Sequence, residues 1–454
     1  MTAAGQEKAN QKPDLALQFA VAADRLHGVY PQKQTDLYMQ RIKIPGGRMN
    51  WPQWRTISQL QERFSPGTPV HLTTRQDIEL HNLCLDDTVK VQQILIDAGL
   101  SVYGACGDSL RNITVCSGCG FCKDGWDVFA VSEAVKDCLQ SQPAIMNLPR
   151  KFKISFSGCR QSCAKPYVND IGFIAVTEKH FEVIVAGSLG PAPALGIMAY
   201  EKLPVSDVFA LCRAAVEMFT ELGERNNRRK ARFRHIRGKL GDDAFLSELD
   251  RRFKEAKNKD PQPEIVLAKT NSDFKLLHRL NIPDGDITAE QILLLADLCQ
   301  PRSIESRINF EHGIELYGLE PLKLPESLKV FENTSIIICC PGNRSCPRGL
   351  INCQLTASMI RNALADDKRF NNVRINISGC PNNCAHSAVA AIGLVGLKRK
   401  KDGISEDCVQ LYTGGGDGRN QNLAQKRGVE TVENIASLNR LIFFQSQQHQ
   451  CCDS

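Results

Sequence analysis

Hydrophobic and polar positions along the chain predict the same short series of elements twice. In each half an apolar strand runs into a Pro-Gly turn, a helix follows, and a second, alternating strand comes next. The expected elements are Met39–Ile44, Trp51–Arg63, Val70–Thr74 and a further helix Thr88–Ala98 in the first half, and His278–Ile282, Ala289–Cys299 and Arg307–Glu311 in the second. Strand–helix–strand units of this size predict a small α+β sandwich in each half.

A cysteine-bearing α/β segment is predicted to follow each sandwich. A helix at Ser132–Gln140 leads to a strand at Ile154–Ser157, and a helix at Leu355–Leu364 leads to a strand at Ile375–Ser378. Between the halves, Ser206–Lys257 reads as helices. Each half is therefore expected to contain two different α/β units.

The sequence itself repeats. Four matches occur in the same order, at an offset of about 220–240 residues. They pair 37–53 with 276–291, 69–83 with 305–319, 112–122 with 335–346, and 153–176 with 374–396. A solenoid repeats at a far shorter period, so the matches indicate a duplicated, two-half α+β architecture.

Composition excludes several classes of protein. The 454 residues suit about two to four domains, and 56 basic against 50 acidic groups are too small an excess to indicate nucleic-acid binding. The longest apolar candidate, Ala388–Leu397, is about half the length that a membrane span needs. Met1–Pro13 is polar and lacks the apolar core of a secretion signal. We therefore expect a cytoplasmic protein without a membrane partner.

The chain has 19 cysteines, which need a chemical explanation. A reducing cytoplasm argues against a disulfide framework and favours metal or redox chemistry. Isolated cysteines usually behave as small buried hydrophobic residues. We expect this of Cys84, Cys138, Cys212, Cys299 and Cys408.

Four clustered cysteines in the second half have the spacing of an iron–sulfur site. Cys340 and Cys346 form C-x5-C, and Cys380 and Cys384 form C-x3-C. Four thiolates from two loops suit a [4Fe–4S] cluster, whereas zinc sites usually use C-x2-C pairs within a shorter span. Small and amide residues let backbone N–H groups approach the sulfurs. Such residues are Gly342, Asn343, Gly379, Asn382 and Asn383. A zinc ribbon and four unrelated buried thiols are the alternatives.

The first half has the same spacing. Cys116 and Cys122 form C-x5-C, with Cys119 between them, and Cys159 and Cys163 form C-x3-C. Either this quartet binds a second cluster or it is a vestige of the duplication.

With these motifs the chain resembles the sirohaem-dependent sulfite and nitrite reductase family. The resemblance extends from Gly28 to Leu441 and rests on an ordered set of motifs: "RIKIPGG", "HLTTRQ", "GDSLRN", "LPRKFK", "CPGNRSC" and "SGCPNNC". It implies a sirohaem beside a [4Fe–4S] cluster in a pseudo-twofold molecule. Cys384 would bridge the cluster to the haem iron, with Cys340, Cys346 and Cys380 as the other cluster ligands.

The resemblance also implies a domain order. A flexible arm (1–27) precedes a ferredoxin-like domain (28–98) and a cysteine-bearing domain (99–200). A helical basic connector (201–260) leads to a second ferredoxin-like domain (261–328) and a 4Fe–4S/sirohaem domain (329–445), and a tail (446–454) ends the chain.

Cations in the family motifs are expected to form the anion site. A small anion on an open iron position needs neutralising charge and a proton supply. By resemblance these residues are Arg41, Arg111, Lys151 and Lys153. Bidentate arginine contacts suit the sirohaem carboxylates. The candidates for that role are Arg75, Arg150, His71 and the run Arg228–Arg234. Most of these cations belong to the first half, which favours one composite site over two equivalent sites.

Electrons are expected from a separate protein. Neither "GACGD" nor "TGGGDG" has the form of a dinucleotide-binding fingerprint. A ferredoxin or a reductase subunit would supply them, and an acidic ferredoxin suits the net charge of +6.

Sulfite reduction to sulfide is the first functional hypothesis. Within the family Lys at the position of Lys153 is typical of sulfite reductases and Asn of nitrite reductases, and a further cation favours the more negative sulfite. Nitrite reduction to ammonia by the same centre is the alternative. A precorrin-3B synthase-like enzyme and a non-catalytic iron–sulfur or tetrapyrrole-binding protein are further alternatives.

Overall fold

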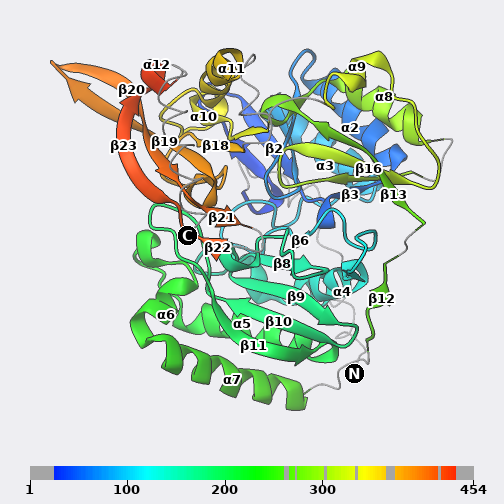
Figure 1. Ribbon diagram of the computed structural model, residues 1–454, viewed down its shortest axis with the longest axis vertical. Helices are drawn as coiled ribbons and strands as arrows, with labels where there is room; N and C mark the ends of the chain where they lie inside the picture. The colour runs from blue at the N-terminus through cyan, green and yellow to red at the C-terminus, as the bar shows by residue number, and fades with distance from the viewer. Residues whose placement is uncertain are drawn as a thin grey trace, which may run out of the picture.

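The computed structural model describes residues 25–259, 265–270, 273–300, 304–332, 336–364, 374–417 and 421–435. Of the arm expected at 1–27, only 25–27 fall in these ranges, and the tail expected at 446–454 lies outside the described residues. The chain has the expected duplicated α+β architecture. Figure 1 shows both ferredoxin-like halves at the upper right, the first cysteine-bearing domain below them, and the second at the upper left.

The two ferredoxin-like halves exchange strands. The first sheet has the order β1 (Val29–Pro31), β2 (Tyr38–Ile42), β5 (Ile78–Leu83), β4 (Val70–Leu72), β14 (Asp286–Ile287). The second has the order β13 (Lys275–Asn281), β16 (Gly313–Gly318), β15 (Glu305–Ile308), β3 (Arg48–Met49). Thus β14 of the second half pairs with β4, and β3 of the first half pairs with β15. Each half completes the sheet of the other, so the two form one unit.

The helices of this unit begin where the sequence places them. Helix α2 (Trp51–Phe64) and helix α8 (Ala289–Cys299) both start with a capping box, formed by Asn50 with Gln53 and by Thr288 with Gln291. These two helices and α3 (Leu85–Asp97) cover a single hydrophobic core that both halves share. The predicted starts of α2 and α8 are confirmed.

The two cysteine-bearing domains have the same sheet order. The first runs β6 (Thr114–Val115), β8 (Ile154–Ser157), β9 (Ile171–Thr177), β10 (His180–Val185), β11 (Ile197–Pro204). The second runs β17 (Ile337–Cys339), β18 (Ile375–Ser378), β19 (Ile392–Lys401), β20 (Ile404–Thr413), β23 (Gln425–Thr431). In both, the first three strands are parallel and the last two are antiparallel. The duplication therefore extends to the cysteine-bearing domains.

Short elements complete the described chain. The helices are α4 (Phe129–Gln140), α9 (Glu326–Lys329), α10 (Gly342–Ser345), α11 (Cys353–Leu364) and α12 (Val432–Ile435), and the strands are β7 (Trp126–Asp127), β12 (Ala268–Lys269), β21 (Gly416–Asp417) and β22 (Gln421–Asn422). No helix in the described part of the chain is long and apolar enough to cross a membrane.

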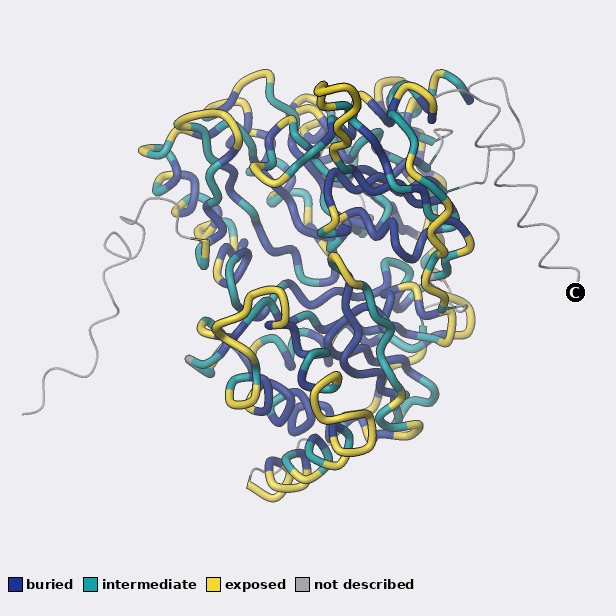
Figure 2. Tube along the Cα trace, turned by 90° about the vertical axis from the view of Figure 1, so that its left-hand side faces the viewer, coloured by how far each residue is buried: buried dark blue, intermediate teal, exposed yellow. Residues whose placement is uncertain are grey.

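The segment expected as a connector, 201–260, completes the core of the first cysteine-bearing domain instead. It begins inside β11 and continues as α5 (Val208–Leu222), α6 (Arg234–Leu240) and α7 (Asp242–Lys259). Buried side chains of these helices belong to the same hydrophobic cluster as β8 to β10. In Figure 2 the outermost helical segment, at the bottom, alternates between buried and exposed positions, as expected of an amphipathic helix on a core.

Candidate active site and iron–sulfur centre

The segment 150–153 orients two of the predicted cations. Phe152 is fully buried, and side chains alternate along an extended chain, so Lys151 and Lys153 point away from the core. The Phe152 N–H donates to the Ser109 carbonyl (3.0 Å), and the Phe152 carbonyl accepts from the Arg111 N–H (2.9 Å). This pairing places Arg111 beside the two lysines.

The lysines lie in a crowded cationic environment. Burial and the nearby Arg232 and Arg111 lower the pKa of Lys151 to about 7. Burial and the nearby Arg75 lower the pKa of Lys153 well below its ordinary value. Both effects favour the uncharged amine. Lys151 can therefore take up and release a proton near neutral pH.

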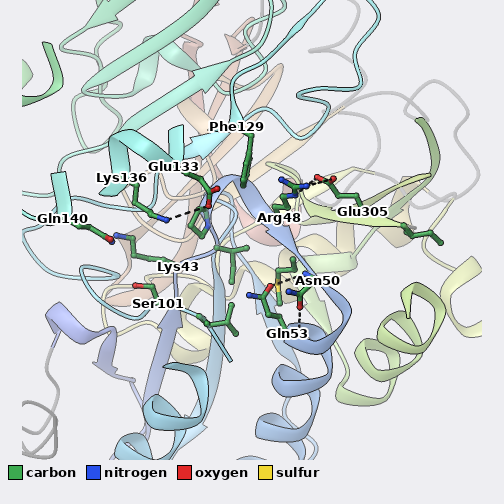
Figure 3. A pocket seen from close by; sticks show the side chains of 16 residues that line it. Lys43, Arg48, Asn50, Gln53, Ser101, Phe129, Glu133, Lys136, Gln140 and Glu305 are labelled. Carbon is green, nitrogen blue, oxygen red and sulfur yellow. Dashed lines mark hydrogen bonds and ion pairs between the residues drawn. The ribbon is translucent and has the colours of Figure 1, made fainter. Parts of the chain in front are cut away.

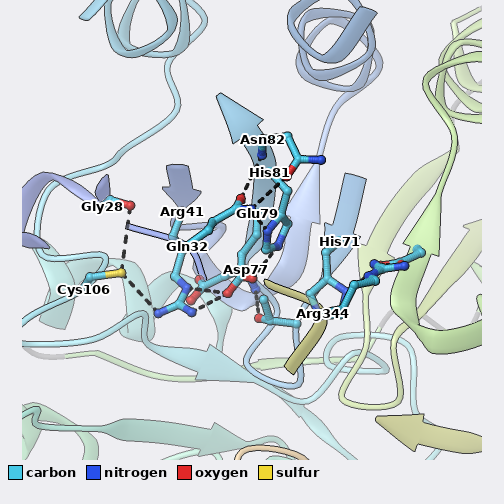
Figure 4. A network of polar contacts seen from close by, with 12 residues as sticks. Gly28, Gln32, Arg41, His71, Asp77, Glu79, His81, Asn82, Cys106 and Arg344 are labelled. Carbon is cyan, nitrogen blue, oxygen red and sulfur yellow. Dashed lines mark hydrogen bonds and ion pairs between the residues drawn. The ribbon is translucent and has the colours of Figure 1, made fainter. Parts of the chain in front are cut away.

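Arg41 is held by a carboxylate and is firmly charged (Figure 4). Its Nε donates to Glu79 Oε1 (3.0 Å) and its Nη1 to Cys106 Sγ (3.3 Å), while His81 Nε2 lies 3.0 Å from Glu79 Oε2. Burial opposes charge here, but Cys106 and Glu79 raise the pKa of Arg41 well above its ordinary value. Glu79 thus fixes the orientation of the guanidinium.

Arg75 and Arg111 are anchored through their terminal nitrogens. Arg111 donates to the carbonyls of Ala105 (2.6 Å) and Gly107 (2.9 Å), and Arg75 donates to Asn169 Oδ1 (2.9 Å). Among the described residues, the buried Nε atoms of both arginines have no hydrogen-bond partner. A buried donor without a partner is costly, so these atoms fit a site that binds an anion.

The second-half cysteines come from two adjacent loops. Cys340 and Cys346 flank α10, and Cys380 and Cys384 follow β18. The Gly379 N–H donates to Cys340 Sγ (3.1 Å). Burial and the facing thiols of Cys384, Cys340 and Cys346 raise the pKa of Cys380 to about 12. The structure therefore brings the predicted quartet together.

Four thiolates that lie together are the donor set of a [4Fe–4S] cubane, in which each thiolate binds a different iron. Hydrogen bonds from Cys353 Sγ (3.9 Å) and the Gly379 N–H lower the pKa of Cys340 to about 6. Its thiolate, the form that binds metal, is thus stabilised.

Cys384 joins the quartet to the cation set. The residue is exposed, yet desolvation by the surrounding chain raises its pKa overall, and Lys151, Lys153 and Arg41 lie close enough to lower it. The Cys384 carbonyl accepts from Thr74 Oγ1 (2.9 Å), which belongs to the first half. The cysteines of the second half and the cations of the first half therefore lie together in the structure, and that they form one composite site stays a prediction.

Three of the residues predicted to bind sirohaem carboxylates already have carboxylate partners in the protein. His71 Nδ1 lies 2.8 Å from Asp286 Oδ1. Arg150 Nη1 lies 3.1 Å from Asp108 Oδ1, and Arg228 from the basic run contacts the same carboxylate at 2.7 Å. Their role toward sirohaem stays a prediction.

Asp77 is a site residue that the sequence did not single out. Burial raises its pKa to about 6, although Arg41, Arg75 and Lys43 lower it. It stands directly after the "HLTTRQ" motif, and this position is the one signal that could have indicated it. Asp77 is a buried anion among the cations of the site.

Lys43 lies between this site and a cavity of about 560 Å³ (Figure 3). It is buried, and its Nζ lies 3.4 Å from the Leu110 carbonyl. Burial lowers the pKa of Lys43 to about 8. Polar side chains dominate the rest of the lining that Figure 3 labels: Arg48, Asn50, Gln53, Ser101, Glu133, Lys136, Gln140 and Glu305.

The first-half cysteines are gathered in the same way. The Gly158 N–H donates to Cys116 Sγ (3.2 Å). Burial and the facing thiols of Cys116, Cys159 and Cys163 raise the pKa of Cys122 to about 12.

The isolated cysteines only partly follow expectation. Cys212, Cys299 and Cys408 are buried, and Cys138 is half-buried. The prediction was wrong for Cys84, which is exposed at the start of α3. A residue at a helix N-terminus does not pack into the core as one on the buried face does.

Comparison with known proteins identifies the family. The nitrite and sulphite reductase 4Fe-4S domain matches residues 106–257 and 332–442, and the nitrite/sulfite reductase ferredoxin-like half domain matches residues 30–98. The chain belongs to the nitrite and sulfite reductase family. The [4Fe–4S] cluster and sirohaem of this family fit the cysteine quartet and the cations described above.

Individual relatives cover most of the chain. A ferredoxin–nitrite reductase of Synechococcus elongatus is 28% identical over 422 residues, covering 86% of this chain and 82% of the relative. An assimilatory ferredoxin-dependent nitrite reductase of Haloferax mediterranei is 27% identical over 455 residues, covering 86% and 76%. The NirA protein of Mycobacterium tuberculosis has the same fold, with a TM-score of 0.76, 20% identity and coverage of 91% and 84%.

Proposed function

We propose that the protein reduces nitrite to ammonia with electrons from a ferredoxin. The observation that carries this proposal is the similarity to ferredoxin-dependent nitrite reductases along most of the chain. It moves the preference from sulfite, the first hypothesis from the sequence, to nitrite. The net charge of +6 supports an acidic ferredoxin as partner.

When bound, the cluster would pass on the electrons of the ferredoxin and the sirohaem would offer the iron that takes the anion. Cys340, Cys346, Cys380 and Cys384 would hold the cluster, and Cys384 would also hold the sirohaem. The position of Cys384 beside Lys151, Lys153 and Arg41 supports this choice among the four.

The cations bind the anion and supply protons. Arg41, fixed by Glu79, and Arg111, fixed by two backbone carbonyls, present permanent charge to the substrate oxygens. Lys151 holds a proton at Nζ that it can deliver near neutral pH, because its pKa is about 7. Lys153 completes the set.

Sulfite is the second candidate, and Lys153 is the observation that favours it. Lys153 favours sulfite only as a full additional cation. Burial and the neighbouring Arg75 and Lys151 lower the pKa of Lys153 well below the ordinary value, so its positive charge is weakened. The position therefore discriminates less than its residue type suggests.

Steady-state turnover on both anions tests the proposal. Reduced ferredoxin and, separately, reduced methyl viologen serve as donors. We expect kcat/KM for nitrite to exceed that for sulfite by about tenfold or more, which corresponds to about 1.4 kcal/mol of transition-state preference. A larger kcat/KM for sulfite with both donors would contradict the assignment.

A further inference from the structure

The first-half cysteines have the backbone frame of the second-half site. Cys116 Sγ accepts from the Gly158 N–H at 3.2 Å, and Cys340 Sγ accepts from the Gly379 N–H at 3.1 Å. The N–H groups of the two cysteines donate to the neighbouring strand, both at 3.1 Å. A hydrogen bond to the first sulfur of the quartet is thus present in both halves.

The loops that carry the other cysteines are also alike. The Cys122 N–H donates to the Gly118 carbonyl at 3.0 Å, and the Cys346 N–H donates to the Gly342 carbonyl at 3.1 Å. A Cβ on Gly118 would lie 2.5 Å from Cys122 Sγ and would clash with it. Glycine at this position therefore allows the observed position of the sulfur.

Both C-x3-C loops keep strained residues at equivalent positions. Ser162 and Asn383 have φ of 57° and 55°, and Lys165 and His386 have φ of 55° and 62°. A left-handed backbone conformation costs energy in residues other than glycine, so it persists only where the surrounding structure stabilises it. Lys165 Nζ lies 3.3 Å from His386 Nδ1, so the two loops meet where the halves join. The shape that holds a cluster in the second half is therefore retained in the first.

Cys119, the fifth cysteine of this region, has a structural role. Its Sγ accepts from the Val128 N–H (3.2 Å) and donates to Asp127 Oδ1 (3.4 Å), it also lies in hydrogen-bond contact with the Cys116 thiol, and the residue is 1% exposed. This leaves the other four thiols as the quartet, and Cys122 faces the remaining three of them. They match the donor set of a cubane.

The charges around the two quartets differ. In the second half Lys151, Lys153 and Arg41 act on Cys384, and Glu79 acts on Cys346. At the first quartet Glu315 acts on Cys122 and Asp124 acts on Cys159, while the buried Arg307 acts on Cys116. The carboxylates of Glu315 and Asp124 would repel those of a sirohaem.

The second-half counterparts of two cations of the anion site neutralise each other. Arg75 and Lys153 correspond by the repeat to Glu311 and Arg374, which form an ion pair with each other. Thr74 corresponds to Phe310, a buried ring. The counterparts of Arg111 and Lys151 (335 and 372) lie outside the described residues.

From the shared frame, and from the ion pair that stands where the other half has two cations of the anion site, we infer that Cys116, Cys122, Cys159 and Cys163 bind a second [4Fe–4S] cluster that has no sirohaem beside it. The inference goes beyond the proposed function and holds for either anion, because it concerns only this metal site.

Metal analysis of the anaerobically purified holoenzyme tests it. Wild type should contain about eight non-haem irons and eight acid-labile sulfides per chain with one sirohaem, and Cys122→Ser and Cys159→Ser should each retain about four irons. Cys84→Ser and Cys119→Ser are the matched controls and should retain about eight. About four irons in wild type, zinc in place of the second set, or two sirohaems per chain would overturn the inference.

Spectroscopy of the wild type keeps the test independent of the variants' folding. Mössbauer spectra of the holoenzyme should contain two cluster components of equal area, one spin-coupled to the haem and one uncoupled. A single coupled component would overturn the inference.

Discussion

The two cysteine quartets have nearly the same backbone and different surroundings. Around Cys116 and Cys340 the N–H···S bonds differ by 0.1 Å. Carboxylates act on Cys122 and Cys159 of the first half, whereas two lysines and an arginine act on Cys384 of the second. A duplicated fold therefore preserved the frame that holds sulfur and iron. The charged side chains near each quartet, which do not determine the backbone of the cysteine loops, differ between the two halves.

This division explains why one composite site is assembled from two halves. The exchanged strands β3 and β14 lock the ferredoxin-like units together, and Thr74 of the first half reaches the Cys384 carbonyl of the second. A charge on one half can thus act on a thiol of the other. Divergence at a few positions is enough to make the equivalent location unsuitable for an anionic macrocycle.

The largest effect is expected from Cys384→Ser. If Cys384 joins cluster and haem iron, the variant loses nitrite turnover and the spin coupling seen by Mössbauer spectroscopy, because a hydroxyl is a poor ligand for this soft centre. Cys163→Ser changes the equivalent position of the first half. It should keep the haem–cluster coupling, and loss of coupling in this variant alone would reverse the roles assigned to the halves.

Next in size is Lys151→Met. Removing a proton donor with a pKa of about 7 should lower kcat for nitrite about 100-fold, with a smaller change in KM. Lys136→Met is the control, since Lys136 lines the neighbouring cavity and lies near carboxylates of its own helix. Equal kcat losses in the two variants would argue against a role for Lys151 in proton delivery.

Lys153→Asn should have a smaller and anion-dependent effect. We expect kcat/KM to fall about tenfold for sulfite and about threefold for nitrite, because sulfite gains more from each cation. Arg374→Asn, the equivalent change in the other half, should alter neither value per sirohaem. Identical losses for both anions with Lys153→Asn would remove this position as a discriminator.

Local signals in the sequence predicted much of the fold. The capping residues Asn50 and Thr288 mark the starts of α2 and α8, and the apolar run Ile154–Ser157 has the bounds predicted for β8. The exchange of β3 and β14 was not predictable, because a two-residue strand has no periodicity. An amphipathic pattern also does not indicate which hydrophobic core a helix packs against. For this reason the sequence predicted α5 to α7 as a connector and not as part of the first cysteine-bearing domain.

Proximity of the candidate residues was predictable from the sequence, and their environment less so. Family motifs indicated Arg41, Lys151 and Lys153, and these side chains lie near Cys384 in the structure. The depressed pKa of Lys153 and the buried charge of Asp77 depend on packing between segments far apart in the sequence. Such desolvation cannot be inferred from residue type alone.

The smallest expected effect concerns Asp77 and pH. Its pKa in the folded protein, about 6, lies above the ordinary value of 3.8, so its protonation stabilises the fold. That contribution, at most about 3 kcal/mol, is complete below about pH 4 and is lost as the pH rises through 6. Protonation also adds one net positive charge to the anion site.

Two measurements follow from this assignment. The KM for nitrite should fall as the pH is lowered from 7.5 to 5.5, and Asp77→Asn should have a KM about threefold lower at pH 7.5 with a flatter pH dependence. Its denaturation midpoint at pH 8 should also exceed that of wild type. The counterpart of Asp77 by the repeat is Gly313, which has no ionisable side chain. This pH dependence should therefore arise at the anion site near the first-half cations and have no equivalent in the second half. A KM that rises in Asp77→Asn would show that the carboxylate orients the cations rather than opposing them.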